Sequence, residues 1–310
     1  MSIDRPFGWI SQISPETFAS TRRGFWPSLG LVSIDEVAIA GHENIFLFKG
    51  SNDYALAYTD LDDDKVLAAQ WISYLNEARA SLDDLGIKFF FSLLPNKATL
   101  LPEEFPLRLR RKITGRAASL LDGLMPAEIE AFHSILGLPA RYSMFRKNDS
   151  HLTDFGNTVF AETLLRGVGL KPAWDNYDFS EFSEVIHAGD LGRRFSPEAR
   201  ETLRLLKHPH QSVHTVKTVS PMRKSRFLGS GYEATNPDAP HDIRLMLFGN
   251  SFVERVPSWG CAMQIVSVVS NFRFLWLPGI DVSEIKAWKP DAVIFQTCER
   301  FLSRQPTSNY

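Results

Sequence analysis

The feature that most constrains this chain is a helical pattern that runs directly into an unbroken apolar stretch. Between Asp62 and Leu85, apolar side chains recur three or four residues apart, which places them on one face of a helix. Gly86 supplies a helix stop, and Ile87–Leu94 is then almost continuously apolar up to Pro95. Such a run is typical of a strand that is buried on both faces. The pattern therefore predicts a helix that feeds a parallel strand.

The same alternation returns near the C-terminus. Three further strands are predicted there, over Ile243–Phe248, Phe272–Leu277 and Asp291–Phe295. We expect a helix around Trp259–Ser270 between the first two, and Asp281 with Glu284 is typical of a helix start before the last. Strands that alternate with helices predict the α/β class, with a mainly parallel sheet flanked by helices on both faces.

The length of 310 residues favours one large domain over residues 1–310, although two domains remain possible. Between the two strand-rich parts, Lys171–His241 holds many prolines and has mixed polarity. We interpret it as an insertion or lid within the domain. It contains one expected helix, Pro197–Leu206, which Ser196 would cap.

Charge and cysteine content exclude several function classes. The net charge is −2 and the lysines and arginines are scattered, whereas a nucleic-acid binder gathers them on one face. The densest basic run is predicted to be the solvated side of a helix and comprises Arg108, Arg110, Arg111 and Lys112. Cys261 and Cys298 are the only cysteines and lack the spacing of a zinc site. We expect no nucleic-acid partner and no structural zinc.

The remaining histidine and cysteine candidates favour structural roles. One histidine cluster is interrupted by proline, lacks a matching carboxylate pattern and comprises His208, His210 and His214. We expect surface histidines there and not metal ligands. Cys298 could be a thiol nucleophile only with a histidine partner, so a buried structural cysteine is favoured. No metal and no cofactor is predicted.

The apolar stretches are too short for a membrane anchor. The first 30 residues contain charged side chains throughout and no continuous apolar core of a signal peptide. The longest apolar runs, near Phe89–Leu94 and Ile265–Val269, fall far below the length of a membrane span. This predicts no intrinsic membrane segment and, taken alone, a cytoplasmic location.

A serine follows one of the predicted strands directly. The strand Ile243–Phe248 ends in the small turn Gly249-Asn250-Ser251, which delivers a hydroxyl at the carboxyl edge of the sheet, where α/β proteins place ligands. A following helix would direct free N–H groups at an oxyanion, as acyl transfer from serine requires. The alternative is that Ser251 merely caps that helix.

A second polar cluster lies in the middle of the chain. Asp149 and His151 precede a helical stretch over Val159–Leu165 that Thr153 could cap. A carboxylate two residues from an imidazole can fix its tautomer and stabilise the imidazolium that forms when the ring takes a serine proton. A polar helix entry without chemistry is the alternative.

Together these motifs resemble the AlgX/AlgJ-type alginate O-acetyltransferases, a branch of the SGNH hydrolase superfamily. In most SGNH enzymes the serine comes first and the Asp-x-x-His last, whereas in this branch Asp-x-His precedes the serine, as His151 precedes Ser251 here. The matching segments follow the family order and are Ile45–Gly50, Leu93–Thr99, Asp149–His151, Gly189–Gly192, Gly249–Phe252, Lys289–Ile294 and Glu299–Leu302.

The resemblance implies a permuted SGNH fold in which Asp149, His151 and Ser251 are catalytic. It also implies acetyl transfer to, or removal from, a polysaccharide through an acyl-enzyme, a periplasmic location, and partner proteins of polysaccharide biosynthesis. Two positions depart from the family pattern: Leu152 replaces a tryptophan, and Asn250 stands where aspartate is frequent. These departures leave open a non-catalytic polysaccharide-binding or scaffolding member of the same fold.

Four further residues are expected to bind substrate or the oxyanion. Asn250 and Phe252 flank the serine, while Lys97 and Arg300 follow predicted strands and could hold charge in the crevice. For the two basic side chains, a surface salt bridge is the alternative. The expected partners are a carbohydrate acceptor and an acyl donor. The same triad serves transfer and hydrolysis, so the sequence leaves that choice open.

Overall fold

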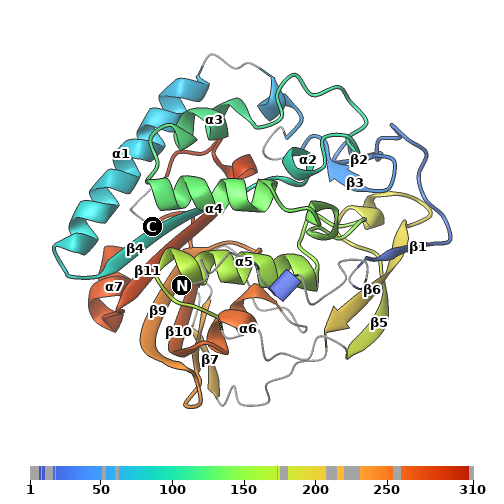
Figure 1. The fold of residues 1–310 in the computed structure, drawn as a ribbon. Coiled ribbons are helices and arrows are strands. Elements are labelled where there is room, and N and C mark those ends of the chain that lie inside the picture. Colours follow the sequence, from blue (N-terminus) through green and yellow to red (C-terminus); the bar gives the residue numbers. More distant parts are fainter. Residues whose placement is uncertain are drawn as a thin grey trace.

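The computed structural model describes residues 7, 9–10, 17, 19–50, 54–59, 63–172, 174, 181–206, 215–219, 231–253 and 260–306. Its centre is a six-stranded sheet in which β4, β11, β9 and β10 run parallel, while β8 and β7 continue it in antiparallel order (Figure 1). The prediction of an α/β fold with a mainly parallel sheet is confirmed. The strands are β4 (Lys88–Leu94), β11 (Ala292–Cys298), β9 (His241–Gly249), β10 (Val269–Trp276), β8 (Gly231–Thr235) and β7 (Thr215–Val219).

Helices cover both faces of this sheet. One face packs against α1 (Asp64–Asp83), α3 (Gly115–Leu121) and α7 (Val282–Trp288), and the other against α5 (Asp154–Gly167) and α6 (Cys261–Val266). Two helices lie near β4: α4 (Pro126–Leu136) packs against it and the short α2 (Lys97–Leu100) follows it.

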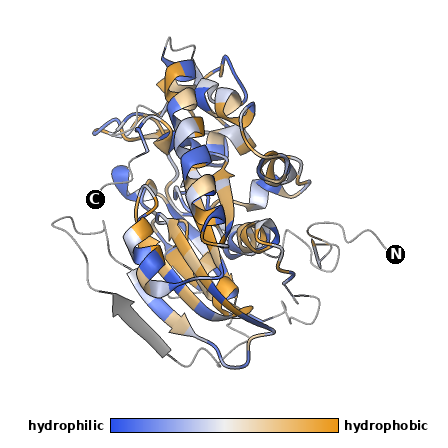
Figure 2. Ribbon diagram, turned by 90° about the vertical axis from the view of Figure 1, so that its left-hand side faces the viewer, coloured by the Kyte–Doolittle hydropathy of each residue, from blue (hydrophilic) through white to orange (hydrophobic). Residues whose placement is uncertain are grey.

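The parallel strands are apolar at consecutive positions because both faces are buried. Leu245 and Leu247 point into the core beneath α5, while Met246 and Phe248 point into the core beneath α1. All four side chains have no exposed surface. Figure 2 shows these strands as mostly orange, between helices that are orange on one side and blue on the other. Each buried side chain of this size contributes roughly 1.5–3 kcal/mol of transfer free energy, which makes the sheet a rigid platform.

Two small sheets lie beside the central one. The first has the order β1-β6-β5, is antiparallel throughout, and contains β1 (Thr21–Arg23), β6 (Arg200–Leu206) and β5 (Phe182–His187). The second pairs β2 (Ala38–Ala40) with β3 (Ile45–Leu47). Residues 181–206 therefore build a separate sheet, whereas residues 215–219 and 231–235 extend the central one.

Several predicted elements are confirmed. The helix predicted over Asp62–Leu85 is α1, and the strands predicted over Ile87–Leu94 and Asp291–Phe295 are β4 and β11. Asp281 caps α7, because its carboxylate accepts from the N–H groups of Ser283 and Glu284 at 2.9 and 3.2 Å. The longest periodic pattern and the Asp281 cap thus located their elements to within a few residues.

One predicted helix is wrong, a second is shorter than predicted, and the basic run is not helical. Residues 197–206 contain the strand β6, because pairing with β1 on one side and β5 on the other outweighs a weak local helix preference. The helix expected over Trp259–Ser270 ends at Val266, and Ser270 already lies in β10. The basic run from Arg108 to Lys112 is solvent-exposed, as expected, but lies in a loop, because α3 starts only after its N-cap Thr114.

The remaining structural expectations concern cysteines, histidines and membrane spans. Cys261 and Cys298 are free and buried, and burial raises the pKa of the Cys298 thiol to about 11. His208, His210 and His214 lie outside the described residues. Within the described ranges, no helix combines the length and apolarity that crossing a bilayer requires.

Candidate active site

The Asp149 motif lies in a tight loop that leads into α5. Phe145 and Leu152 form a β-bridge at its base. Thr153 caps α5, as predicted, because its hydroxyl accepts from the N–H of Gly156 at 3.0 Å. A Cβ atom on Gly156 would lie 2.1 Å from the backbone oxygen of Met144, so only glycine fits where the loop and the helix meet. The local sequence therefore fixes how the loop enters the helix.

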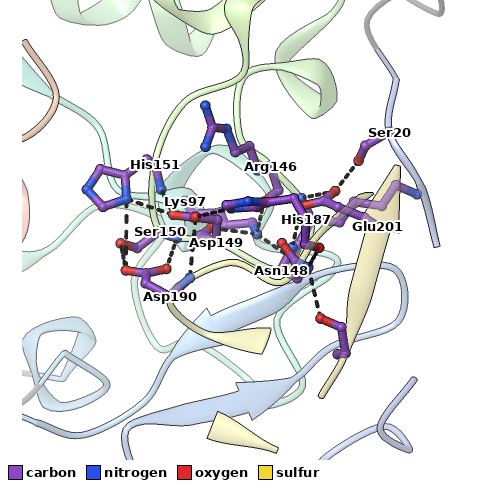
Figure 3. Close-up of polar contacts among 12 residues, drawn as sticks. Ser20, Lys97, Arg146, Asn148, Asp149, Ser150, His151, His187, Asp190 and Glu201 are labelled. Atoms are coloured by element: carbon purple, nitrogen blue, oxygen red, sulfur yellow. Dashed lines mark hydrogen bonds and ion pairs between the residues drawn. The ribbon is translucent and has the colours of Figure 1, made fainter. Parts of the chain in front are cut away.

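A buried lysine holds this loop from within the protein. The Lys97 ammonium donates to the carbonyl oxygens of Ile45 at 2.9 Å, Arg146 at 2.6 Å, Lys147 at 2.9 Å and Asp149 at 3.3 Å (Figure 3). Burial lowers the pKa of Lys97 to about 7, while nearby carboxylates oppose this shift. Lys97 forms no salt bridge with any described residue, and its buried ammonium supports the loop from within the protein.

The other side of the loop is held by a buried carboxylate and an amide. Glu201 of β6 accepts from the backbone N–H groups of Lys147 at 3.0 Å and Asn148 at 3.2 Å. The Asn148 side chain donates to the backbone oxygens of His187 and Ala199, both at 2.9 Å. The strand β6 thus anchors the Asp149 loop. This contact joins the small β1-β6-β5 sheet to the candidate site.

Asp149 and His151 form the expected pair. Asp149 Oδ1 lies 2.7 Å from His151 Nδ1 and also accepts from the His151 backbone N–H at 2.9 Å. Burial acts to raise the pKa of Asp149, but hydrogen bonds from His151 and His187 outweigh it and hold the pKa well below its usual range. The carboxylate therefore remains ionised and fixes the orientation of a half-exposed imidazole.

The structure adds two residues to this pair that sequence reasoning missed. His187 Nε2 lies 3.0 Å from Asp149 Oδ2, so the carboxylate lies between two imidazoles (Figure 3). Asp190 accepts from the backbone N–H and the hydroxyl of Ser150 at 2.7 and 2.5 Å, and its own N–H donates to Asp149 at 3.3 Å. Burial and the neighbouring Asp149 charge raise the pKa of Asp190.

Sequence signals for these two residues were unequal. Gly189-Asp190 resembled a family element, and a Cβ atom on Gly189 would lie 2.4 Å from the backbone oxygen of Asn148. That close approach explains the glycine. His187 is the last residue of β5 and lies just before the Gly189-Asp190 element, outside the residues that resemble the family. Only the folding of β5 against β6 and the Asp149 loop brings it to the site.

The polar cluster also brings together potential metal ligands. Among the described residues, Asp149, His151 and Asp190 offer ligand atoms that all lie within 4.8 Å of one another. The 2.7 Å contact between Asp149 and His151 is a hydrogen bond, and a metal ion would have to replace the proton that orients the ring. The arrangement is therefore that of an oriented histidine.

Ser251 lies in a turn directly after β9. It is partly exposed, and the turn is closed by Asn250, which accepts from the N–H groups of Phe252 at 3.1 Å and Val253 at 3.0 Å. The N-cap of α6 is Gly260, so Ser251 does not cap that helix. The next described helix after the serine, α6, begins at Cys261, close to the predicted start at Trp259, and residues 254–259 lie outside the described ranges.

The two motifs meet at the ring of Phe252. The Phe252 and His151 ring centroids are 5.5 Å apart, and the Arg300 guanidinium lies 4.9 Å from the Phe252 ring centroid. Among the described residues, no hydrogen bond joins Ser251 to His151. The fold therefore brings the two motifs together, and the direct contact between serine and histidine stays a prediction.

The supporting candidates gather at one edge of the sheet. β4, β11 and β9 are parallel neighbours, so Asn96, Arg300 and Ser251 all follow strand ends on the same side. The Arg300 N–H donates to Asn96 Oδ1 at 3.2 Å. The parallel pairing therefore places the carboxyl ends of these three strands at one edge of the sheet.

Comparisons with known proteins agree on the fold. No protein-family model matches the chain, and no curated protein matches it in sequence. PatB1 from Bacillus cereus superposes with a TM-score of 0.60 at 12% identity, over 86% of this chain and 97% of that one. The O-acetyltransferase domain of Pseudomonas putida AlgJ gives 0.53 at 16% identity, over 87% and 94%.

A third solved structure is also similar. A DHHW family protein from Eubacterium siraeum gives a TM-score of 0.52 at 12% identity and covers 88% of this chain and 96% of that one. Identities this low establish the architecture and leave the chemistry to the residues of the site. The chain therefore shares the fold of PatB1 and of the AlgJ O-acetyltransferase domain.

Proposed function

We propose that this protein is a serine-dependent O-acyltransferase or esterase that transfers or removes an acetyl group on a carbohydrate. The observation that carries the proposal is the oriented Asp149–His151 pair, which lies against Phe252, the residue next to Ser251. The fold of the AlgJ O-acetyltransferase domain supports acetyl as the acyl group, and the motif resemblance to alginate O-acetyltransferases supports a carbohydrate.

In the first half of the proposed reaction, the Ser251 hydroxyl attacks the carbonyl carbon of an acyl donor while His151 Nε2 takes its proton. Asp149 holds the Nδ1 proton and stabilises the imidazolium. The Ser251 backbone N–H, which donates to no other described residue, lies beside the reacting hydroxyl and would stabilise the oxyanion. The imidazolium then protonates the leaving group, and an acyl-serine remains.

The second half returns the enzyme to its starting state. His151 removes a proton from an acceptor hydroxyl, and that oxygen attacks the acyl-serine carbonyl. A sugar hydroxyl as acceptor gives transfer, whereas water gives hydrolysis. The proton on His151 then returns to the Ser251 oxygen, so atoms and charge balance in both outcomes.

One observation favours a second candidate, a non-catalytic polysaccharide-binding member. The residue after His151, a tryptophan in the family pattern, is Leu152 here, and this side chain is buried in the core at 2% exposure. A buried leucine offers no ring to an acyl donor or a sugar. Loss of that contact is compatible with a protein that keeps the fold and binds carbohydrate without turning it over.

Hydrolysis of 4-nitrophenyl acetate by the purified protein separates these candidates. Ser251→Ala and His151→Ala should each remove nearly all activity, about 10³-fold or more, because the triad acts as a unit. Asp149→Ala should leave somewhat more activity, and the Ser251–His151 double variant should cost little beyond either single change. Ser73, an exposed serine on α1, offers Ser73→Ala as the matched control with unchanged turnover.

The products of transfer are then identified by mass. The protein is incubated with an acetyl-ester donor and candidate oligosaccharides, and a gain of one acetyl group on the sugar identifies a transferase. Wild-type turnover in folded Ser251→Ala would place the nucleophile elsewhere. An absence of turnover in the wild type with both esters and oligosaccharides would favour the binding protein.

A further inference from the structure

A cavity of about 90 Å³ lies beside the proposed nucleophile, at the carboxyl edge of the central sheet. Gly249 and Asn250, the two residues before Ser251, form part of its wall. The rest of the wall comes from α1, from the ends of β10 and β11, and from the segments that follow these two strands. Because this is the edge at which α/β sheets bind ligands, a group held here is adjacent to the acyl-serine.

Aromatic rings line one side of the cavity. Trp276, the last residue of β10, is partly exposed, and Phe301 follows β11. Trp71 of α1 also lines the cavity, and its indole N–H donates to the backbone oxygen of Arg304 at 3.0 Å. This hydrogen bond joins the segment after β11 to α1. The cavity therefore presents rigid flat faces.

Two polar side chains from largely buried residues, Asn250 and Thr297, also line the cavity, and each keeps a hydrogen-bonding group that no other described residue engages. The Asn250 and Thr297 side chains belong to residues that are 8% and 5% exposed. Within the described part of the chain, Asn250 Nδ2 and the Thr297 hydroxyl make no hydrogen bond. By contrast, Gln296 has both ends of its amide engaged, with the Asn250 N–H at 3.4 Å and the Thr297 carbonyl at 2.9 Å.

We infer that this cavity binds a pyranose ring of the carbohydrate substrate, an inference that rests on the proposed function. A pyranose has an apolar C–H face, which fits the indole of Trp276, and hydroxyl groups at its rim, which can bond Asn250 and Thr297. An acyl chain in the same cavity would displace water from these two polar groups and leave them unpaired, which is costly. The lining therefore favours a sugar over an acyl chain.

Two acetyl esters with the same acyl group test this assignment: methyl 6-O-acetyl-glucopyranoside and 4-nitrophenyl acetate. The readout is the ratio of KM for the sugar ester to KM for the nitrophenyl ester. Trp276→Ala should raise this ratio about tenfold, which corresponds to the loss of one good contact. Thr297→Val keeps the shape of the side chain and removes one hydrogen bond, so the same ratio should rise roughly threefold to tenfold.

Trp288→Ala is the matched control. Trp288 ends α7 and packs under the Arg244 guanidinium at 4.5 Å, at the opposite edge of the sheet, so both esters should be unaffected. Equal losses on both esters in Trp276→Ala and Thr297→Val would assign the cavity to the acyl group or to the chemistry and overturn the inference. Unchanged kinetics in both variants would overturn it as well.

A binding measurement keeps this inference separate from the proposed function. If the wild type hydrolyses neither ester, the proposed function fails, and tryptophan fluorescence is titrated with cellotetraose instead. Quenching in the wild type and in Trp288→Ala, but not in Trp276→Ala, supports a sugar-binding cavity without catalysis. No quenching in the wild type, or equal quenching in all three proteins, overturns it.

Discussion

At the scale of single residues, Asp149 is the centre of the candidate site. Its two carboxylate oxygens face different imidazoles, His151 at 2.7 Å and His187 at 3.0 Å. The contact with His151 could be predicted from the sequence, because Asp149 and His151 are two residues apart. The contact with His187 could not be predicted, because His187 reaches Asp149 only through the pairing of β5 with β6.

His187 is predicted to be a positioning residue that acts through Asp149. His187→Ala should lower kcat for 4-nitrophenyl acetate by about tenfold with little change in KM, because a carboxylate with one partner holds His151 less well. His187→Gln, which can still donate to Asp149, should recover part of kcat. Steady-state kinetics of both variants, with thermal stability measured in parallel, checks this.

The double variant supplies the control for this prediction. In the Asp149→Ala background, His187→Ala should cost nothing further, since the residue through which it acts is already missing. If the two losses multiply, or if His187→Gln behaves like His187→Ala, His187 affects activity by another route.

At the scale of elements, a helix or strand could be predicted from sequence only when the contacts that stabilise it are encoded within its own segment. The helix α1 spans 20 residues with a helical apolar period, and the strand β4 spans 7 mostly apolar residues. The local sequence was therefore sufficient to predict both elements. The strand β6 carries the charged residues Arg200, Glu201 and Arg204 without a regular alternation, and it is held by β1, more than a hundred residues away in sequence, and by β5. The residue pattern within one segment does not show which distant strands it will pair with, so β6 could not be predicted from it.

One prediction concerns how β6 is joined to α5. Asp154, the first residue of α5, accepts from the Leu206 N–H at the end of β6 at 2.8 Å. Burial raises the pKa of Asp154 to about 7, although the Leu206 hydrogen bond and Arg146 oppose this shift. Between about pH 4 and pH 7 the folded protein therefore keeps a proton that the unfolded chain loses, and its stability falls as pH rises.

Asp154→Asn removes this titration and keeps an oxygen for the Leu206 N–H. The free energy of unfolding is measured with urea at pH 5 and pH 7.5. Between these two values, that of the wild type should fall by roughly 1–4 kcal/mol relative to that of the variant. Using the difference between the two proteins cancels titration elsewhere in the chain. The same difference at both pH values would contradict the assignment.

At the scale of the whole molecule, the carboxyl edge of the sheet could be predicted from sequence. Parallel strands place their ends together, so the segments after β4, β9 and β11 had to meet. The path of residues 171–241 could not be predicted. Part of this range forms a sheet with β1, and part extends the central sheet, because the partners of these strands are set by the complete fold.

The insertion or lid proposed over Lys171–His241 therefore has two structural roles in its described parts. β5 and β6 supply His187 and Glu201 to the candidate site, whereas β8 and β7 lengthen the sheet on the far side of β10. A segment identified by its prolines and mixed polarity contributes directly to the site. Its composition gave no indication of this.

The central claim, that Ser251 is an activated nucleophile, is tested most directly by covalent labelling. A sulfonyl fluoride is a suitable probe, because only an activated serine reacts with it at neutral pH. After incubation at neutral pH, intact mass and peptide mapping should show one sulfonyl group on Ser251, and His151→Ala should abolish it. An unmodified Ser251 in the folded wild type, or labelling that is equal in His151→Ala, would contradict the account.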